Sequence, residues 1–141
     1  MIDAHCHLDS AHFEEDRQVL VDRAVDKGVR GFVVAGVDPE GWLRQEKLED
    51  HFPRVRSAFG IHPWAVSSMG DEELSSALKL LQNRCRFAVG ETGIDRSRRC
   101  PPESYGRQLK AYRAQLEIAR EQNLPVILHI VGAHGQALEV L

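Results

Sequence analysis

The sequence predicts an α/β protein with a parallel β-sheet, on three observations. Short apolar and β-branched segments of about strand length recur five times along the 141 residues. Segments with the three- and four-residue apolar spacing of amphipathic helices separate them. The strand segments are continuously apolar rather than alternating, which is typical of parallel sheets covered on both faces. Five such units make either an open sheet or part of a barrel, because a closed eight-unit barrel usually takes about 250 residues.

In chain order, the predicted strands are Met1–Cys6, Gly31–Gly36, Val55–Ile61, Phe87–Gly90 and Pro125–Ile130. The first helix is expected over residues 14–27, ending at Gly28, because glycine accepts the left-handed turn that ends many helices. The second begins after Asp38, an N-cap acceptor that is followed by proline at the first helical position. The remaining helices are expected over Leu74–Leu81 and Tyr105–Ala119, and residues 132–141 begin another.

The composition is that of an ordinary globular chain, with 43% hydrophobic and 28% charged residues and a net charge of −3. Without a linker or low-complexity segment, residues 1–141 are expected to form a single domain. Three cysteines without a CxxC pair indicate neither a disulfide framework nor a thiolate zinc site. The sequence has no signal-like start and no long apolar run, so a cytoplasmic protein without membrane association is expected. The small negative charge means that nucleic acid binding requires a local basic patch or a bound metal.

His5 and His7 stand at the end of the first predicted strand. Residues two apart in a strand point to the same side, so both imidazoles can converge on one metal ion. The alternative interpretation is a pair of surface or core histidines near the terminus. Asp9 is then expected as a supporting residue that holds the second nitrogen of a ligand histidine. Cys6 is expected to point away from the histidines as a packed thiol.

Glu91 follows the fourth apolar segment directly and lies between two glycines that allow close backbone approach. A carboxylate has two oxygens and can bridge two metal ions, which makes Glu91 a candidate ligand and catalytic residue. The alternative is that Glu91 caps the following segment or pairs with an arginine of the next loop.

His129 lies near the end of the fifth predicted strand, and His62 follows the third. The carboxyl ends of parallel strands meet at the rim where α/β active sites are built, so these side chains are expected near His5, His7 and Glu91. His62 is a candidate for substrate contact or proton transfer. For each histidine, a hydrogen-bonded core residue is the alternative interpretation.

Arg96, Arg98 and Arg99 form the one concentrated basic patch near these residues. Their guanidinium groups are candidates for binding a substrate phosphate, and a solvated loop is the alternative. The sequence has no P-loop, no GxSxG motif and no GxGxxG motif opening a helix, which leaves metal-assisted hydrolysis as the chemistry indicated.

Four motifs together resemble the TatD-type metal-dependent deoxyribonucleases, a branch of the amidohydrolase-like TIM-barrel metallohydrolases. They are HCHLD from His5, GIHPW from Gly60, GETGID from Gly90, and QLEIAREQNLPVILH from Gln115 to His129. The resemblance implies a (β/α) TIM-barrel-type metallohydrolase, of which this sequence represents about the first five βα units.

The resemblance implies that His5, His7, Glu91 and His129 are metal ligands, with Glu91 bridging, and that His62 contacts the substrate. It further implies a deoxyribonuclease that hydrolyses DNA phosphodiester bonds, typically from an end, by a metal-activated water. The cofactors expected from the family are divalent ions, two per site, of magnesium, manganese or zinc. The alternatives are a metal hydrolase of amides, lactones or other phosphoesters, and an inactive metal-binding remnant.

The sequence departs from the family in two places. The family usually has an arginine two residues after the last histidine, where this sequence has Val131. The family also takes a histidine and an aspartate from later strands. This sequence lacks that histidine and aspartate, and three explanations fit. It is a fragment of a longer protein, a natural short form, or one part of a barrel completed by another copy. The first explanation is expected. An open barrel edge predicts self-association.

Overall fold

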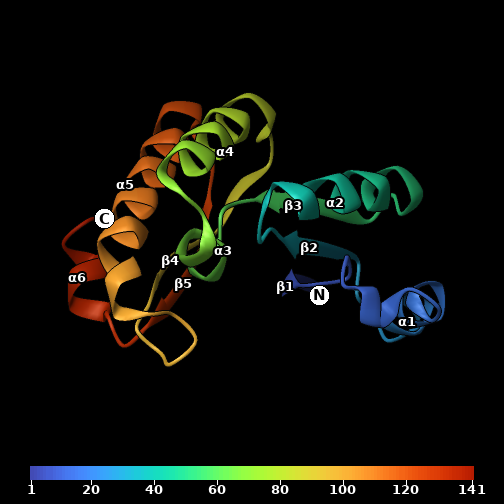
Figure 1. Cartoon of the computed structure of the whole chain (residues 1–141). Coiled ribbons are helices and arrows are strands. Elements are labelled where there is room, and N and C mark those ends of the chain that lie inside the picture. Colours follow the sequence, from blue (N-terminus) through green and yellow to red (C-terminus); the bar gives the residue numbers. More distant parts are fainter.

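The computed structural model describes all residues from Met1 to Leu141. Its five strands form one parallel sheet in sequence order (Figure 1). The strands are β1 (Ile2–Cys6), β2 (Gly31–Ala35), β3 (Val55–Phe59), β4 (Ala88–Asp95) and β5 (Val126–Val131). Strands added in the same direction with right-handed crossovers place every connecting helix on one face of the sheet. The predicted α/β class with a parallel sheet is confirmed.

The helices are α1 (Arg17–Asp26), α2 (Pro39–His51), α3 (Pro63–Ser68), α4 (Asp71–Arg84), α5 (Tyr105–Gln122) and α6 (His134–Leu138), with short 3-10 helices at Ala11–Phe13 and Pro102–Ser104. Helix α2 begins as predicted, because the Asp38 carboxylate accepts a hydrogen bond of 2.7 Å from the Gly41 amide. Helix α3 was not predicted, since its six residues are too few to show an apolar period.

Strand β4 extends to Asp95, beyond the predicted end at Gly90. Its second half pairs with β5, with Thr92 opposite Leu128 and Asp95 opposite Val131. All eight residues of β4 are buried. Polar residues therefore continue the strand, because the neighbouring strand supplies hydrogen bonds that the sequence alone does not reveal.

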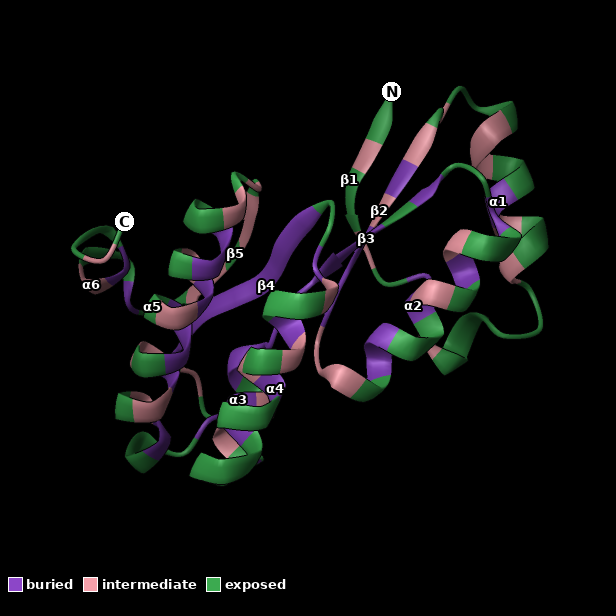
Figure 2. Cartoon of the chain, turned by 90° about the horizontal axis from the view of Figure 1, so that it is seen from above, coloured by how far each residue is buried: buried purple, intermediate pink, exposed green.

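The core lies between the sheet and the helices. Figure 2 shows α1 and α2 beside the first strands and α5 beside β4 and β5, with buried segments facing the sheet. Helix α6 contacts β5. Trp42 and Leu81 are fully buried between α2, α4 and the centre of the sheet, and Tyr112 is fully buried between α5 and the end of β4. The central strands are thus anchored most firmly, and they carry part of the site described below.

The expectation that both faces of every strand are covered is wrong for the two outer strands. Ile2 in β1 is 62% exposed, and Leu128 and Val131 in β5 are 39% and 38% exposed. Each outer strand pairs with only one neighbour, so one edge of it is left open. No helix of the chain is both long and apolar enough to span a bilayer. The cytoplasmic location stays a prediction.

Candidate metal centre

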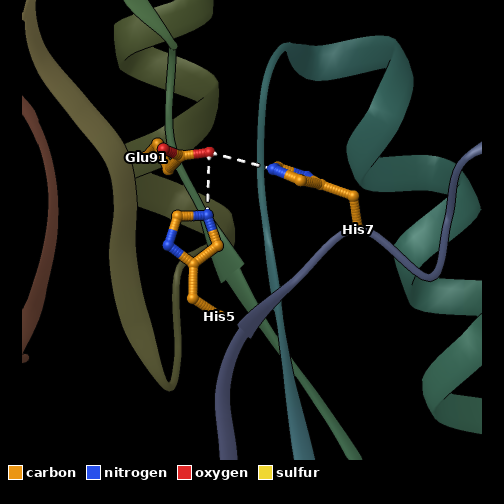
Figure 3. A group of neighbouring side chains, drawn as sticks. All are labelled: His5, His7 and Glu91. Carbon is orange, nitrogen blue, oxygen red and sulfur yellow. Dashed lines mark ion pairs between the residues drawn. The ribbon is translucent and has the colours of Figure 1, made fainter.

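The Glu91 carboxylate lies between the two histidines at the end of β1 (Figure 3). The Nε2 atoms of His5 and His7 are each 3.2 Å from Glu91 Oε2. Strands β2 and β3 separate β1 from β4, so a flat sheet would hold those two strands about 14 Å apart. Curvature of the sheet turns their inner faces toward one another, and this curvature creates the cluster.

The second Glu91 oxygen faces a different histidine. His129 Nδ1, from β5, lies 3.4 Å from Glu91 Oε1. The ligand atoms form two groups, each with its members within 4.8 Å of one another, and Glu91 belongs to both: His5, His7 and Glu91, and His62, Glu91 and His129. Imidazole nitrogens with a shared carboxylate suit divalent ions such as zinc and manganese, so the donor set fits two of the expected metals.

The charge state of the cluster also suits a cation. Burial by itself raises the pKa of Glu91, but the hydrogen bond with His7 and the nearby His5 outweigh it and lower the pKa to about 2. The same hydrogen bond raises the pKa of His7. Glu91, only 4% exposed, is therefore an ionised carboxylate held in a largely buried position, where a cation is the natural partner.

His62 is the N-cap of α3, and its Nδ1 accepts a hydrogen bond of 3.0 Å from the Trp64 amide. Burial, followed by the proximity of His129, lowers the pKa of His62 to about 4, so the ring is neutral near pH 7. In a neutral imidazole one nitrogen accepts and the other carries the proton, so Nε2 is a hydrogen-bond donor. This state fits the predicted substrate contact.

Asp95 is a site residue that the sequence analysis missed. Its Oδ2 lies 3.1 Å from His129 Nε2 and accepts a hydrogen bond of 2.7 Å from the Trp64 indole, while Oδ1 accepts one of 2.6 Å from the Ser97 amide. Burial raises the pKa of Asp95, but these hydrogen bonds outweigh it and hold the pKa well below its usual range. Because His129 Nε2 is engaged by Asp95, Nδ1 faces Glu91. The available signal was the spacing from Glu91, since residues four apart in a strand share a face.

Two glutamines of α5 hold the ends of the site-bearing strands. Gln115, fully buried, accepts from the Ile61 amide at 2.7 Å and donates to the Ile61 carbonyl at 3.0 Å. Gln108 accepts a hydrogen bond of 2.8 Å from the Asp95 amide. The two glutamines are seven residues apart, on one face of α5. They position the backbone next to His62 and at Asp95, a role that no sequence pattern indicated.

The residues expected to support the site behave differently. Asp9 lines the same cleft as His7 and is 7% exposed, with its pKa raised by burial. No side-chain hydrogen bond joins Asp9 to His5 or His7, and its Oδ1 has no partner, so its supporting role stays a prediction. The Cys6 thiol donates to the Val33 carbonyl at 3.4 Å and has its pKa raised to about 11, mainly by burial. Cys6 is a packed thiol, as expected.

The three loop arginines are divided between two places. The Arg99 guanidinium lies 4.6 Å from the centroid of the Trp64 ring, at the edge of the candidate metal site. Arg96 lies 4.0 Å from the Tyr105 ring centre and lines a second cleft with Arg98. None of the three forms an ion pair, and the alternative in which Glu91 pairs with one of them is wrong because Glu91 faces histidines.

A cleft of about 560 Å³ opens onto the centre. Its lining residues include His7, His62, Trp64, Glu91 and His129. The cleft therefore gives a substrate access to both groups of candidate ligands.

Comparison with known proteins gives the family directly. The sequence pattern of the family described as TatD related DNase matches residues 2–141. A 3'-5' ssDNA/RNA exonuclease TatD from Escherichia fergusonii is 33% identical over 142 residues, covering 100% of this chain and 54% of that protein. An uncharacterized metal-dependent hydrolase, YjjV, from Escherichia coli is 32% identical over 137 residues, covering 96% of this chain and 52% of that protein. The chain thus spans about half the length of the curated relatives it matches.

Solved structures show the same fold. The crystal structure of YjjV, a TatD homolog from Escherichia coli, superimposes with a TM-score of 0.85 at 30% identity, covering 99% of this chain and 54% of that one. A TatD family hydrolase from Entamoeba histolytica gives a TM-score of 0.81 at 19% identity, covering 99% and 52%. The expected barrel-type fold, present here as five βα units, is confirmed.

Proposed function

Because the chain belongs to the family of TatD-related DNases, we propose that its metal centre serves the hydrolysis of phosphodiester bonds in single-stranded DNA, from an end. The observation that carries the proposal is the position of Glu91, whose Oε2 faces His5 and His7 while its Oε1 faces His129. A carboxylate so placed is suited to hold two ions at the short separation used in phosphodiester hydrolysis.

Each residue of the centre has a distinct task in this proposal. His5, His7, Glu91 and His129 would hold the divalent ions. When bound, magnesium, manganese or zinc ions would supply an acidified water and neutralise charge on the phosphate. Asp95 keeps His129 oriented, and neutral His62 donates a hydrogen bond from Nε2 to a phosphate oxygen. Arg99 supplies a positive charge at the rim of the centre, beside the Trp64 ring.

Digestion of end-labelled single-stranded DNA with Mn²⁺ or Mg²⁺ tests the proposal. We expect progressive shortening from one end, stopped by EDTA and reduced at least about 100-fold by Glu91→Gln, since loss of a ligand charge removes binding and orientation together. Glu117→Gln is the matched control, because Glu117 is an exposed residue of α5 that pairs with Arg120. It should cleave like the wild type.

Cleavage that is indifferent to both EDTA and Glu91→Gln would refute the metal mechanism. A panel of amides, lactones and other phosphoesters separates the substrate classes, since activity on those alone would rule out the nuclease. Isothermal titration with Mn²⁺ tests the two-ion stoichiometry independently of activity. Mn²⁺ binding without hydrolysis of any substrate would identify an inactive metal-binding protein.

We also propose that the isolated chain self-associates through the outer strands. Ile2 in β1 and Leu128 and Val131 in β5 are apolar and exposed, and each outer strand has an unpaired edge. Both features favour association with another chain. Light scattering across a concentration series should show species above 15.9 kDa. A monodisperse monomer at all concentrations would contradict the proposal.

A further inference from the structure

An aromatic side chain stands exposed at the edge of the metal centre. Trp64 is 39% exposed and lines the same cleft as Glu91 and His129. The other tryptophan of the chain, Trp42, is fully buried in the core. Trp64 therefore offers an apolar, flat surface to a molecule that enters the cleft of the candidate metal centre.

Trp64 is held in one orientation by polar contacts at both ends of the residue. Its amide donates to His62 Nδ1 at 3.0 Å, and its indole N–H donates to Asp95 Oδ2 at 2.7 Å. The His62 and His129 rings pack at steep angles to it, with centroids at 4.4 and 5.8 Å. The indole plane is therefore fixed relative to His129, through the same Asp95 oxygen that orients that histidine.

Arg99 shows what the open face of this indole accepts. Its guanidinium, a flat cationic group, lies over the ring at 4.6 Å from the centroid and forms no ion pair. A cation on an aromatic face is weakly bound where water reaches it. A nucleobase has the same flat shape with a larger apolar surface, and a backbone phosphate offers Arg99 the anionic partner that it lacks.

We propose that Trp64 is a stacking platform for a nucleobase next to the scissile phosphate, and that Arg99 leaves the indole to bind a backbone phosphate when the base is in place. The inference rests on the proposed nuclease function and adds a preference for substrates with an unpaired base next to the scissile phosphate. The base must be unpaired and present, because bases within a duplex are stacked on one another and an abasic sugar offers no ring. The alternative is that the Trp64 indole only forms a wall of the cleft and does not contact a base.

Binding of a fluorescein-labelled oligothymidylate, followed by anisotropy in EDTA, tests the stacking separately from hydrolysis. We expect Trp64→Leu to weaken binding about 10-fold or more, from the usual contribution of base–aromatic stacking, while Trp64→Phe retains most of the affinity. Intrinsic fluorescence gives a second readout. The oligonucleotide should quench the wild type, and the quenching should be absent in Trp64→Phe, where only buried Trp42 emits.

The role of Arg99 is tested by salt dependence. Arg99→Gln should weaken binding and lower the slope of log affinity against log salt by about one, as expected for one lost phosphate contact. Arg113→Gln is the matched control, because Arg113 lies on α5 among residues that line a different cleft from Trp64. Its affinity and salt slope should equal those of the wild type.

Hydrolysis with Mn²⁺ then links stacking to the reaction. An oligonucleotide with an abasic terminal residue should be cleaved about 10-fold or more slowly than the intact one by the wild type, and at a similar rate by Trp64→Leu. If DNA is hydrolysed but Trp64→Leu binds as tightly as the wild type and abasic ends are cleaved equally well, the stacking inference is wrong and the nuclease proposal stands. If the chain neither binds nor hydrolyses DNA, both are overturned.

Discussion

Replacing Gly93 with alanine tests whether close contact between β4 and β5 holds His129 in the metal centre. Gly93 lies opposite His129 in the strand pair. A Cβ atom at this position would lie 2.0 Å from the His129 carbonyl oxygen and 2.9 Å from its carbonyl carbon. The φ angle of Gly93 is +149°, a conformation that residues with a side chain rarely adopt. The expected close backbone approach at this glycine is therefore present in the structure.

The expected loss in the free energy of unfolding of Gly93→Ala follows from two effects. Backbone strain in such a conformation costs about 1–3 kcal/mol for a residue other than glycine. The overlap is with backbone atoms, so relief requires the strands to separate, with each lost hydrogen bond costing about 0.5–1.5 kcal/mol. Together they predict a loss of about 3 kcal/mol or more in the free energy of unfolding. For a chain of this size the melting temperature should fall by roughly 10 °C.

Urea unfolding followed by circular dichroism measures the loss, and Gly106→Ala is the matched control. Nothing lies within 4 Å of a Cβ atom at Gly106, the second residue of helix α5. The same chemical change should there leave stability unchanged or raise it by up to about 0.5 kcal/mol. Gly93→Ala should also weaken Mn²⁺ binding through the displaced His129. A Gly93→Ala variant within about 0.5 kcal/mol of the wild type would refute the reasoning.

Three further predictions concern buried polar groups and a helix end. Gln115→Leu leaves both backbone groups of Ile61 without partners and should cost about 2–4 kcal/mol in urea unfolding, whereas a neutral result would mean that water replaces the amide. Tyr112→Phe removes a buried hydroxyl that has no partner, so stability should stay equal or rise by up to about 1 kcal/mol, and a clear loss would reveal a partner. Burial raises the pKa of Tyr112, so the folded state favours the neutral phenol. The stability that this preference contributes is lost as pH rises above about 10, and the free energy of unfolding should fall less steeply with pH there in Tyr112→Phe than in the wild type. Asn123 ends α5 at φ 54°, so Asn123→Ala should lower stability by about 1 kcal/mol and Asn123→Gly should not, as thermal unfolding would show.

Much of the candidate site could be predicted because its ligands mark the ends of strands. His5, His7 and His129 each lie at or next to the end of an apolar segment, and parallel strands bring those ends to one rim. The four motifs identified the family for the same reason, since they record local residue order. These features depend on neighbours in the chain and on hydrophobic periodicity, which the sequence states directly.

Other features depend on contacts between distant segments. Asp95 acquires its role only because β4 continues past Glu91 and pairs with β5, which brings it to His129 and Trp64. Gln115 acts on Ile61 from 54 residues away. No local pattern of polarity distinguishes such residues from ordinary polar residues of a helix or loop.

By itself, the sequence determined the α/β class, the strand order along the chain and the identity of the candidate metal ligands. Tertiary structure decided the curvature that brings β1 to β4, the exposure of the outer strands, and the orientation of His62, Trp64 and His129. The physical reason is that apolar periodicity and strand-end position are properties of short segments, whereas a side chain's hydrogen-bond partner and a sheet's curvature arise only when segments far apart in the chain pack together.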